Sequence, residues 1–230
     1  MVFADTYRHS MLLTNPLQFV INAIYLLPAL VVGIVGHELA HAAVAVARGD
    51  QTPRLDGRLS ISPRQHLDPL GTIAAFFIYF GWGKPIRLNP YRMRTAWDPA
   101  LVWLAGPLAS FLIAIAISIP LKLLLTSGVL GLESPPVQLL LVAFYFNVLL
   151  AVVNIIPIPG LDGYHFLGAL LRRRFSKLFF QLDSNRQVIL LAVIVVLIFA
   201  PLLLGATVLD YLYAPVAQLL LGSGVRPIGF

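Results

Sequence analysis

Apolar residues gather in four stretches that are each long enough to cross a lipid bilayer as a helix. A transmembrane helix needs about 20 mostly apolar residues to cross about 30 Å of hydrocarbon. Prolines and a glycine interrupt the third stretch near 157–160, so we expect that helix to be broken there. The pattern predicts an all-α polytopic membrane protein with about four transmembrane helices. Their expected bounds are 17–47, 99–121, 137–171 and 188–221.

The region 51–90, between the first two spans, carries two weaker patterns. The run GTIAAFFIYFGW, residues 71–82, is apolar but too short to span, which is typical of a re-entrant or interfacial segment. Before it, PRLDGRLSIS (53–62) alternates around Asp56-Gly57, a strong turn signal. We therefore expect a small membrane-associated β-hairpin followed by a re-entrant segment. No repeat or linker divides the sequence, so we expect one domain over residues 1–230.

The composition agrees with an integral membrane protein. Hydrophobic residues make up 59% of the chain and charged residues 11%, with a mean hydropathy of +0.86, which lies outside the range of soluble domains. The formal net charge is +6, but no basic stripe alternates with aromatic residues, so we do not expect nucleic acid as a partner. The chain has no cysteine, which excludes disulfides and thiolate metal ligands.

Basic residues predict the orientation of the chain in the membrane. They concentrate in the stretches that follow the first and third spans, and such stretches face the cytosol. We therefore expect both termini to be extracytoplasmic, in a cell membrane. The residues of the two stretches are Arg48, Arg54, Arg58, Arg64, Lys84, Arg87, Arg92, Arg94, Arg172, Arg173, Arg174, Lys177 and Arg186, against Arg8, Lys122 and Arg226 on the other side.

The stretch GIVGHELAHAAVA places two histidines and a glutamate inside the first apolar span. His37, Glu38 and His41 form the pattern H-E-x-x-H, which on a helix puts both imidazoles on one face, where they can bind one metal ion. In such sites zinc polarises a water molecule and the glutamate accepts its proton. A glutamate at the bilayer centre costs about 2.5–3.5 kcal/mol, so its presence indicates function. The alternative is that the histidines hydrogen-bond across helices in a polar seam.

A zinc site needs a third protein ligand, and few acidic residues are available for it. Besides Glu38, only Asp162 lies deep within apolar sequence, in the segment NIIPIPGLDGYHF. Irregular backbone at that depth is tolerated only inside the protein or beside a water-filled cavity. We therefore expect Asp162 to lie in a cavity near the cytosolic end of the third span, at a depth similar to that of His37 and His41.

These two motifs together resemble the site-2 protease family of intramembrane zinc metalloproteases. The second motif is Asn154-x-x-Pro157-x-Pro159-x-Leu161-Asp162-Gly163, and the segments HLDPLGT and GWGKPIRLNP between the motifs are also similar to that family. The resemblance implies that His37, His41 and Asp162 bind one zinc ion, that Glu38 is the catalytic base, and that Asn154 hydrogen-bonds the substrate carbonyl.

The resemblance also implies a substrate class. Family members cleave transmembrane helices of single-span proteins and release a cytosolic fragment, and their substrates include membrane-tethered transcription regulators and anti-sigma factors. The hairpin and re-entrant region would present an edge to which an unwound substrate adds as a strand. Many members carry a PDZ domain or a CBS pair. The 230 residues leave no room for either, so we expect a minimal form.

Other polar residues near the motifs have two interpretations each. His66 and Asp68 would contact the metal or, more in keeping with the neighbouring Pro69, form a turn. His165 would support the metal site or pack at the membrane interface. Asn147 lies two helical turns before Asn154 and would bond a neighbouring helix or line the cleft. The pair Gly106 and Ser110 has the small-x-x-x-small spacing typical of close helix packing.

Two other functions remain compatible with parts of this pattern. An ion or proton transporter would also break a helix at the membrane midplane, but transport does not require a glutamate beside two histidines. A catalytically silent homologue that binds membrane proteins should lack a ligand or the base. Here His37, Glu38, His41 and Asp162 are all present.

Overall fold

The computed structural model describes residues 16–78, 81–204 and 208–222. Three helices in it are long and apolar enough to cross a membrane: α2 (Pro16–Ala47), α6 (Asp98–Ser127) and α7 (Pro135–Ile155). A fourth candidate span consists of α9 (Ser176–Ser184) and the start of α10 (Arg186–Leu204), which meet at 64°. The prediction of an all-α membrane protein is confirmed in its mostly helical character. Against the expected four or so spans the described residues hold three or four candidates, and the fourth begins at Ser176 instead of at residue 188.

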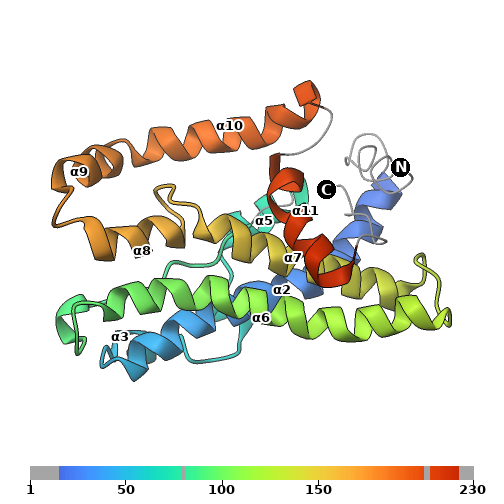
Figure 1. The fold of residues 1–230 in the computed structure, drawn as a ribbon, viewed down its shortest axis with the longest axis horizontal. Helices are drawn as coiled ribbons and strands as arrows, with labels where there is room; N and C mark the ends of the chain where they lie inside the picture. Colours follow the sequence, from blue (N-terminus) through green and yellow to red (C-terminus); the bar gives the residue numbers. More distant parts are fainter. Residues whose placement is uncertain (1–15, 79–80, 205–207, 223–230) are drawn as a thin grey trace.

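Helix α7 lies at the centre of the bundle, beside α2 and α6 (Figure 1). Most of its residues are buried because apolar side chains cover its whole circumference. One of its faces packs on α2 and on the short helix α5 (Pro69–Ile78), and another packs on α6 and α11 (Val208–Leu221). The most enclosed side chains of the core include Leu30, Ile34, Leu121, Phe144, Tyr145, Phe146 and Tyr213.

The third predicted span is broken where the prolines and glycine lie. Helix α7 ends at Ile155, and α8 (Asp162–Leu171) begins after the segment that contains Pro157, Pro159 and Gly160. Gly160 has a φ of +109°, a conformation that a side chain disfavours. A Cβ on Gly163 would collide with the carbonyl oxygen of Ile155, so the start of α8 approaches the end of α7 closely. This break places Asp162 in the first turn of a new helix.

The predicted β-hairpin over residues 53–62 is wrong. The chain forms the short helix α3 (Thr52–Leu55) there, then a turn, then the short helix α4 (Pro63–His66). Pro53 lies in the first turn of α3, where its missing N–H costs nothing. Gly57, with a φ of +70°, follows that helix instead of joining two strands. Asp56-Gly57 therefore does lie in a turn, as predicted, but this turn follows a short helix and does not connect two strands.

After α4, the chain that contains the apolar run 71–82 leads away from one end of α2 and then comes back to the same end. The two arms of the excursion pair through an antiparallel bridge between Leu67 and Gly83, and the Lys84 N–H donates to the His66 carbonyl at 2.6 Å. Between the arms, α5 runs toward the start of α2, where the rings of Phe77 and Phe19 lie 5.8 Å apart. Residues 79–80 lie outside the described part of the chain, and the placement of this segment as re-entrant in a membrane stays a prediction. A 3-10 turn (Pro90–Arg92) then leads toward α6.

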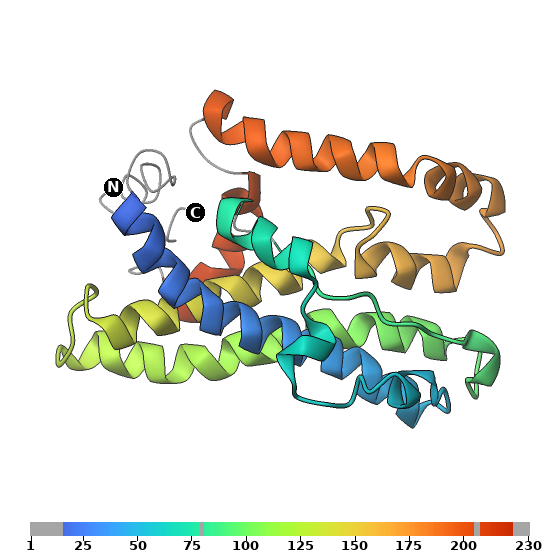
Figure 2. The ribbon, with the colours of Figure 1, turned by 180° about the vertical axis from the view of Figure 1, so that it is seen from behind.

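The stretch predicted as a fourth span contains two helices, α10 and α11 (Figure 2). Helix α11 folds back on α7, where the rings of Tyr213 and Tyr145 lie 5.6 Å apart. Helix α10 runs along the side of the bundle on which α7 breaks, and the connecting residues 205–207 lie outside the description. A cavity separates part of α10 from the other helices, and the polar residues of the first span line it.

Candidate metal centre

Helix α2 brings His37 and His41 together on one face near its C-terminal end. The two residues are 5% and 1% exposed, and the Nε2 atoms of their imidazoles lie 3.2 Å apart. Residues four apart on a helix are neighbours on its surface, so the spacing alone produces this pair. The H-E-x-x-H pattern therefore lies on a helix, as expected.

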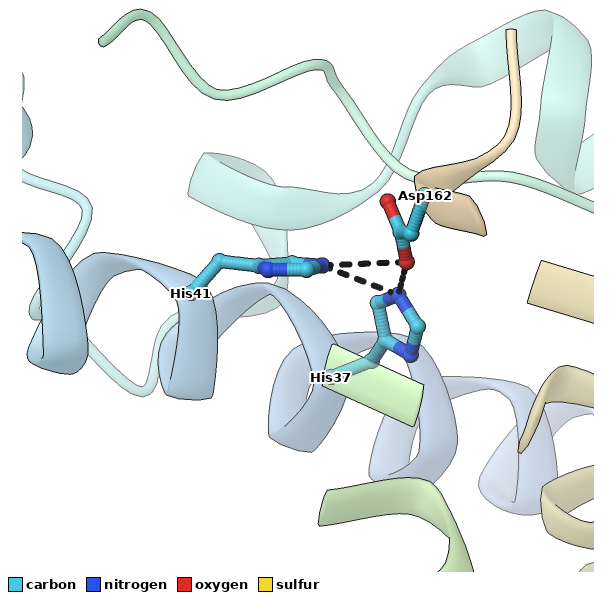
Figure 3. Close-up of side chains that lie close together, drawn as sticks. All are labelled: His37, His41 and Asp162. Atoms are coloured by element: carbon cyan, nitrogen blue, oxygen red, sulfur yellow. Dashed lines mark hydrogen bonds and ion pairs between the residues drawn. The ribbon is translucent and has the colours of Figure 1, made fainter. Parts of the chain in front are cut away.

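Asp162 completes a group of three with these histidines. Its Oδ2 atom lies 2.8 Å from Nε2 of His37 and 3.2 Å from Nε2 of His41 (Figure 3). All three ligand atoms lie within 4.8 Å of one another. Ligands about 2.0–2.1 Å from a tetrahedral zinc ion are separated by about 3.3 Å, so the observed spacing is close to that of a zinc site. The sequence prediction that Asp162 meets the two histidines is matched by this geometry.

The opposite nitrogen of each imidazole has its own partner on α6. Nδ1 of His41 donates to the Val102 carbonyl at 2.6 Å, and Nδ1 of His37 lies 2.9 Å from the Ser110 hydroxyl. A carbonyl oxygen can only accept a hydrogen bond, so Nδ1 of His41 carries the hydrogen. In the neutral ring Nε2 then carries a lone pair. The Ser110 hydroxyl can accept in the same way from His37. Partners of this kind fix the tautomer and orientation of metal-binding histidines.

This donor set fits a divalent metal ion. Two nitrogen lone pairs and a carboxylate oxygen point toward one another inside the protein, and they repel unless a cation or protons lie between them. Gly106 keeps the adjoining space open, because a Cβ there would collide with Nε2 of His41 and lie 2.6 Å from Nε2 of His37. Two imidazoles and a carboxylate, with room for a fourth ligand, are typical of catalytic zinc.

Glu38 lies beside the three residues without joining them. Its Oε2 atom is 3.5 Å from Nη2 of Arg58, and its side chain is 12% exposed. On another side it contacts Gly83, where an added Cβ would lie 2.6 Å from Oε1. The carboxylate is therefore held between the loop that carries Arg58 and the returning arm that carries Gly83.

These residues line one cavity of about 740 Å³. His37, Glu38, His41 and Asp162 form one wall, and Asn154 also faces the cavity. The opposite wall is largely apolar and comes from α10, while Gly81, Trp82, Gly83, Pro85 and Ile86 of the returning arm form a further side. The metal centre therefore opens onto a space that suits an apolar chain segment.

The two asparagines of α7 differ in position. Asn154 lines the cavity, and its Nδ2 donates to the Leu150 carbonyl one turn earlier at 2.9 Å. Asn147 is fully buried, its Nδ2 donates to the Ala143 carbonyl at 2.8 Å, and it does not line the cavity. The structure therefore places Asn154 on the wall of the cavity that the metal group also lines, and Asn147 in the core.

The remaining polar candidates lie outside the metal group. Nε2 of His66 donates to the Ser60 carbonyl at 2.6 Å, and Asp68 accepts from the Gly71 N–H at the start of α5, which agrees with the interpretation as turn residues. His165 lines the cavity and stacks on Trp103 at 4.4 Å, and Trp103 in turn contacts the ring of His41. His165 therefore lies close to the metal group, with the Trp103 ring between it and His41.

Sequence reasoning missed three contributors to the site. Ser110 and Gly106 looked like a generic packing pair, and Arg58 was one of many basic loop residues. A hydroxyl and a glycine one turn apart, inside a span that must approach His37, are the signal that could have identified the first two. No local signal distinguishes Arg58, because its burial depends on the fold of the whole loop.

Comparisons with known proteins connect the chain to peptidases. A family model described as Peptidase family M50 matches residues 131–201, which include Asn154 and Asp162. "Putative zinc metalloprotease YwhC" of Bacillus subtilis is 35% identical over 150 residues, which cover 62% of this chain and 67% of that protein. "Putative zinc metalloprotease Rip2" of Mycobacterium tuberculosis H37Rv is 30% identical over 161 residues, which cover 65% of this chain and 58% of that protein. No solved structure matches the chain significantly.

Proposed function

The chain belongs to peptidase family M50, and from this premise we propose that it is a zinc metalloprotease that hydrolyses peptide bonds of membrane proteins within the membrane. The observation that carries the proposal is the convergence of His37, His41 and Asp162, from two separate helices, beside the carboxylate of Glu38. The names of the two relatives describe zinc metalloproteases, which supports zinc as the metal.

The three converging residues would hold the zinc ion through Nε2 of His37, Nε2 of His41 and a carboxylate oxygen of Asp162. When bound, zinc with an open position lowers the pKa of a water molecule and polarises a carbonyl oxygen. The Val102 carbonyl and the Ser110 hydroxyl orient the imidazoles, so the ligands need little rearrangement to bind the ion.

Glu38 would move the proton in the reaction. Its carboxylate takes one proton from the attacking water as the water oxygen bonds to the substrate carbonyl carbon. It then gives that proton to the amide nitrogen as the carbon–nitrogen bond breaks, so the carboxylate is regenerated. Its position on the cavity wall beside the ligands supports this role.

Asn154 would bind the substrate carbonyl. A side-chain amide has two hydrogens on nitrogen, and in Asn154 one of them is directed at the Leu150 carbonyl. The second hydrogen remains to donate to a carbonyl oxygen in the cavity, where negative charge develops during attack. Asn147 has no comparable position, so we propose no substrate contact for it.

A substrate helix must lose its own hydrogen bonds before a peptide bond can be attacked. The segment 81–86 lines the cavity and carries the bridge at Gly83, so an unwound substrate could add to it as a strand. Pro85 has no N–H, which limits such pairing to a few hydrogen bonds. In this proposal the segment 81–86 provides the edge for strand pairing that we expected from the hairpin and the re-entrant region together.

The proposal extends to substrates and orientation. The metal centre lies near the end of α2 that precedes the basic residues of 48–94, which supports an active site toward the cytosol. Both termini, which lie outside the described residues, then face away from the cytosol. Substrates would be single-span proteins cut to release a cytosolic fragment, with membrane-tethered transcription regulators and anti-sigma factors as candidates.

The test is cleavage of candidate single-span substrates by purified protein in proteoliposomes. We expect wild type to cleave, a zinc chelator to stop cleavage, and Glu38→Gln to lower the rate at least about 100-fold while zinc stays bound. Glu133→Gln is the matched control, because Glu133 is exposed and remote from the cavity. Equal cleavage by Glu38→Gln and wild type would rule out the proposed mechanism.

A further inference from the structure

Arg58 is buried although it belongs to a loop rich in exposed basic residues. It is 6% exposed, whereas Arg54 and Arg64 on either side of it are exposed. A guanidinium withdrawn from water is costly unless its hydrogens find acceptors. The acceptors that it finds should therefore show why this arginine points inward.

The guanidinium of Arg58 joins three parts of the chain. Nη1 donates to the Gln65 carbonyl and Nη2 to the Lys84 carbonyl, so both arms of the re-entrant excursion are attached to it. The same Nη2 lies 3.5 Å from Oε2 of Glu38. Since Gly83 contacts the other side of that carboxylate, Glu38 is enclosed by Arg58 and by the residue next to Lys84.

We propose that Arg58 is a positioning residue that holds the Glu38 carboxylate at a fixed position relative to the segment 81–86. The inference rests on the proposed function, in which Glu38 transfers the proton and 81–86 pairs with the substrate. One nitrogen that contacts both Lys84 and Glu38 fixes the distance between the base and the bound peptide bond. Reaction rates are sensitive to such distances, and a displacement of about 1 Å can cost about 100-fold.

The chemistry of arginine suits this arrangement. A planar guanidinium presents several N–H donors in a rigid fork, so it can bond two carbonyls and a carboxylate at once. A lysine ammonium is a point charge on a flexible stem and would not hold the three groups in the same geometry. Arg58 does not touch His37, His41 or Asp162 through any hydrogen bond or ion pair found among the described residues, so it acts on the base and not on the metal ligands.

The test separates kcat from KM in Arg58→Gln and Arg58→Lys, with Arg54→Gln as the control for loss of a loop charge. We expect kcat to fall about 10–100-fold in both Arg58 variants, with wild-type zinc content, and Arg54→Gln to match wild type. An arginine that only fastens the loop would instead raise KM and leave kcat unchanged at saturating substrate. That result, or loss of zinc in parallel with activity, would overturn the proposal.

A double-mutant cycle with Glu38→Asp tests whether Arg58 acts through Glu38. If it does, shortening the carboxylate removes most of what Arg58 contributes, and the effects of the two substitutions on kcat are not additive. Additive effects would contradict the proposal. If Arg58→Gln does not fold, the cycle is made with Arg58→Lys. Failure of wild type to cleave would refute the proposed function, whereas wild-type kcat in Arg58 variants beside an inactive Glu38→Gln would refute only this inference.

Discussion

The Oδ2 atom of Asp162 lies 2.8 Å from Nε2 of His37, although 125 residues separate the two along the chain. The contact exists because α7 breaks at its prolines and α8 starts again with Asp162 in its first turn. A continuous helix would carry this carboxylate past α2. The helix break is therefore what brings Asp162 to the two histidines in the candidate metal centre.

Ser110→Ala should weaken zinc binding while leaving the fold intact. The substitution removes the hydroxyl that lies 2.9 Å from Nδ1 of His37, so the imidazole loses its orientation and its preferred tautomer. Loss of such a partner typically lowers metal affinity about 10–100-fold. Competition with a chelator of known affinity measures the change. Ser118→Ala is the matched control, because the Ser118 hydroxyl donates to the Ile115 carbonyl of its own helix, and an equal effect there would contradict the role of Ser110.

Gly106→Ala should abolish zinc binding and cleavage. The new methyl group would collide with Nε2 of His41 and lie 2.6 Å from Nε2 of His37, in the space beside the metal. Overpacking of this kind also costs about 1–3 kcal/mol of stability. Zinc content per chain and thermal unfolding in detergent check both effects. In the control Gly131→Ala, the added Cβ has no atom of the described residues within 4 Å, so both properties should match wild type. Full zinc content in Gly106→Ala would show that the site lies elsewhere.

His66 should make the fold less stable in mild acid. Burial lowers the pKa of this imidazole, and the nearby cations Arg58 and Lys84 lower it further. Because the unfolded chain then binds the proton more tightly than the folded chain, His66 favours folding above its unfolded pKa of about 6.5. This contribution disappears as the pH falls through the folded pKa. Protonation would also create an N–H at Nδ1, which has no partner among the described residues.

Thermal unfolding between pH 5 and 8 measures this effect. The unfolding temperature of wild type should decrease as the pH falls below about 6.5, and His66→Gln should show a smaller decrease over the same range. Asn89→Gln, a polar change elsewhere in the same loop region, should keep the wild-type pH dependence. An identical slope for His66→Gln and wild type would mean that His66 does not contribute.

The convergence of the three proposed metal ligands was predictable because each of them had a local signal. His37 and His41 have the spacing of one helical face, and Asp162 is one of very few acidic residues in apolar sequence, next to an obvious helix break. The long apolar runs likewise predicted α2, α6 and α7. These features depend on local periodicity and on the cost of charge in lipid, which a single sequence displays.

The loop between the first two spans was not predictable in the same way. Asp56-Gly57 is compatible with a hairpin and with the end of a short helix, and tertiary contacts decide between them. Arg58 is drawn inward by the Gln65 and Lys84 carbonyls and by Glu38, none of which adjoins it in sequence. Ser110 acquires its role only when α6 packs on α2.

The most direct test of the central claim is the zinc content of purified protein, measured together with X-ray absorption at the zinc edge. We predict about one zinc ion per chain with nitrogen and oxygen ligands at about 2.0–2.2 Å, two of them imidazoles, and loss of the ion in Asp162→Ala. Wild-type zinc content and an unchanged spectrum in Asp162→Ala would contradict the claim that this carboxylate and the two histidines bind one metal ion.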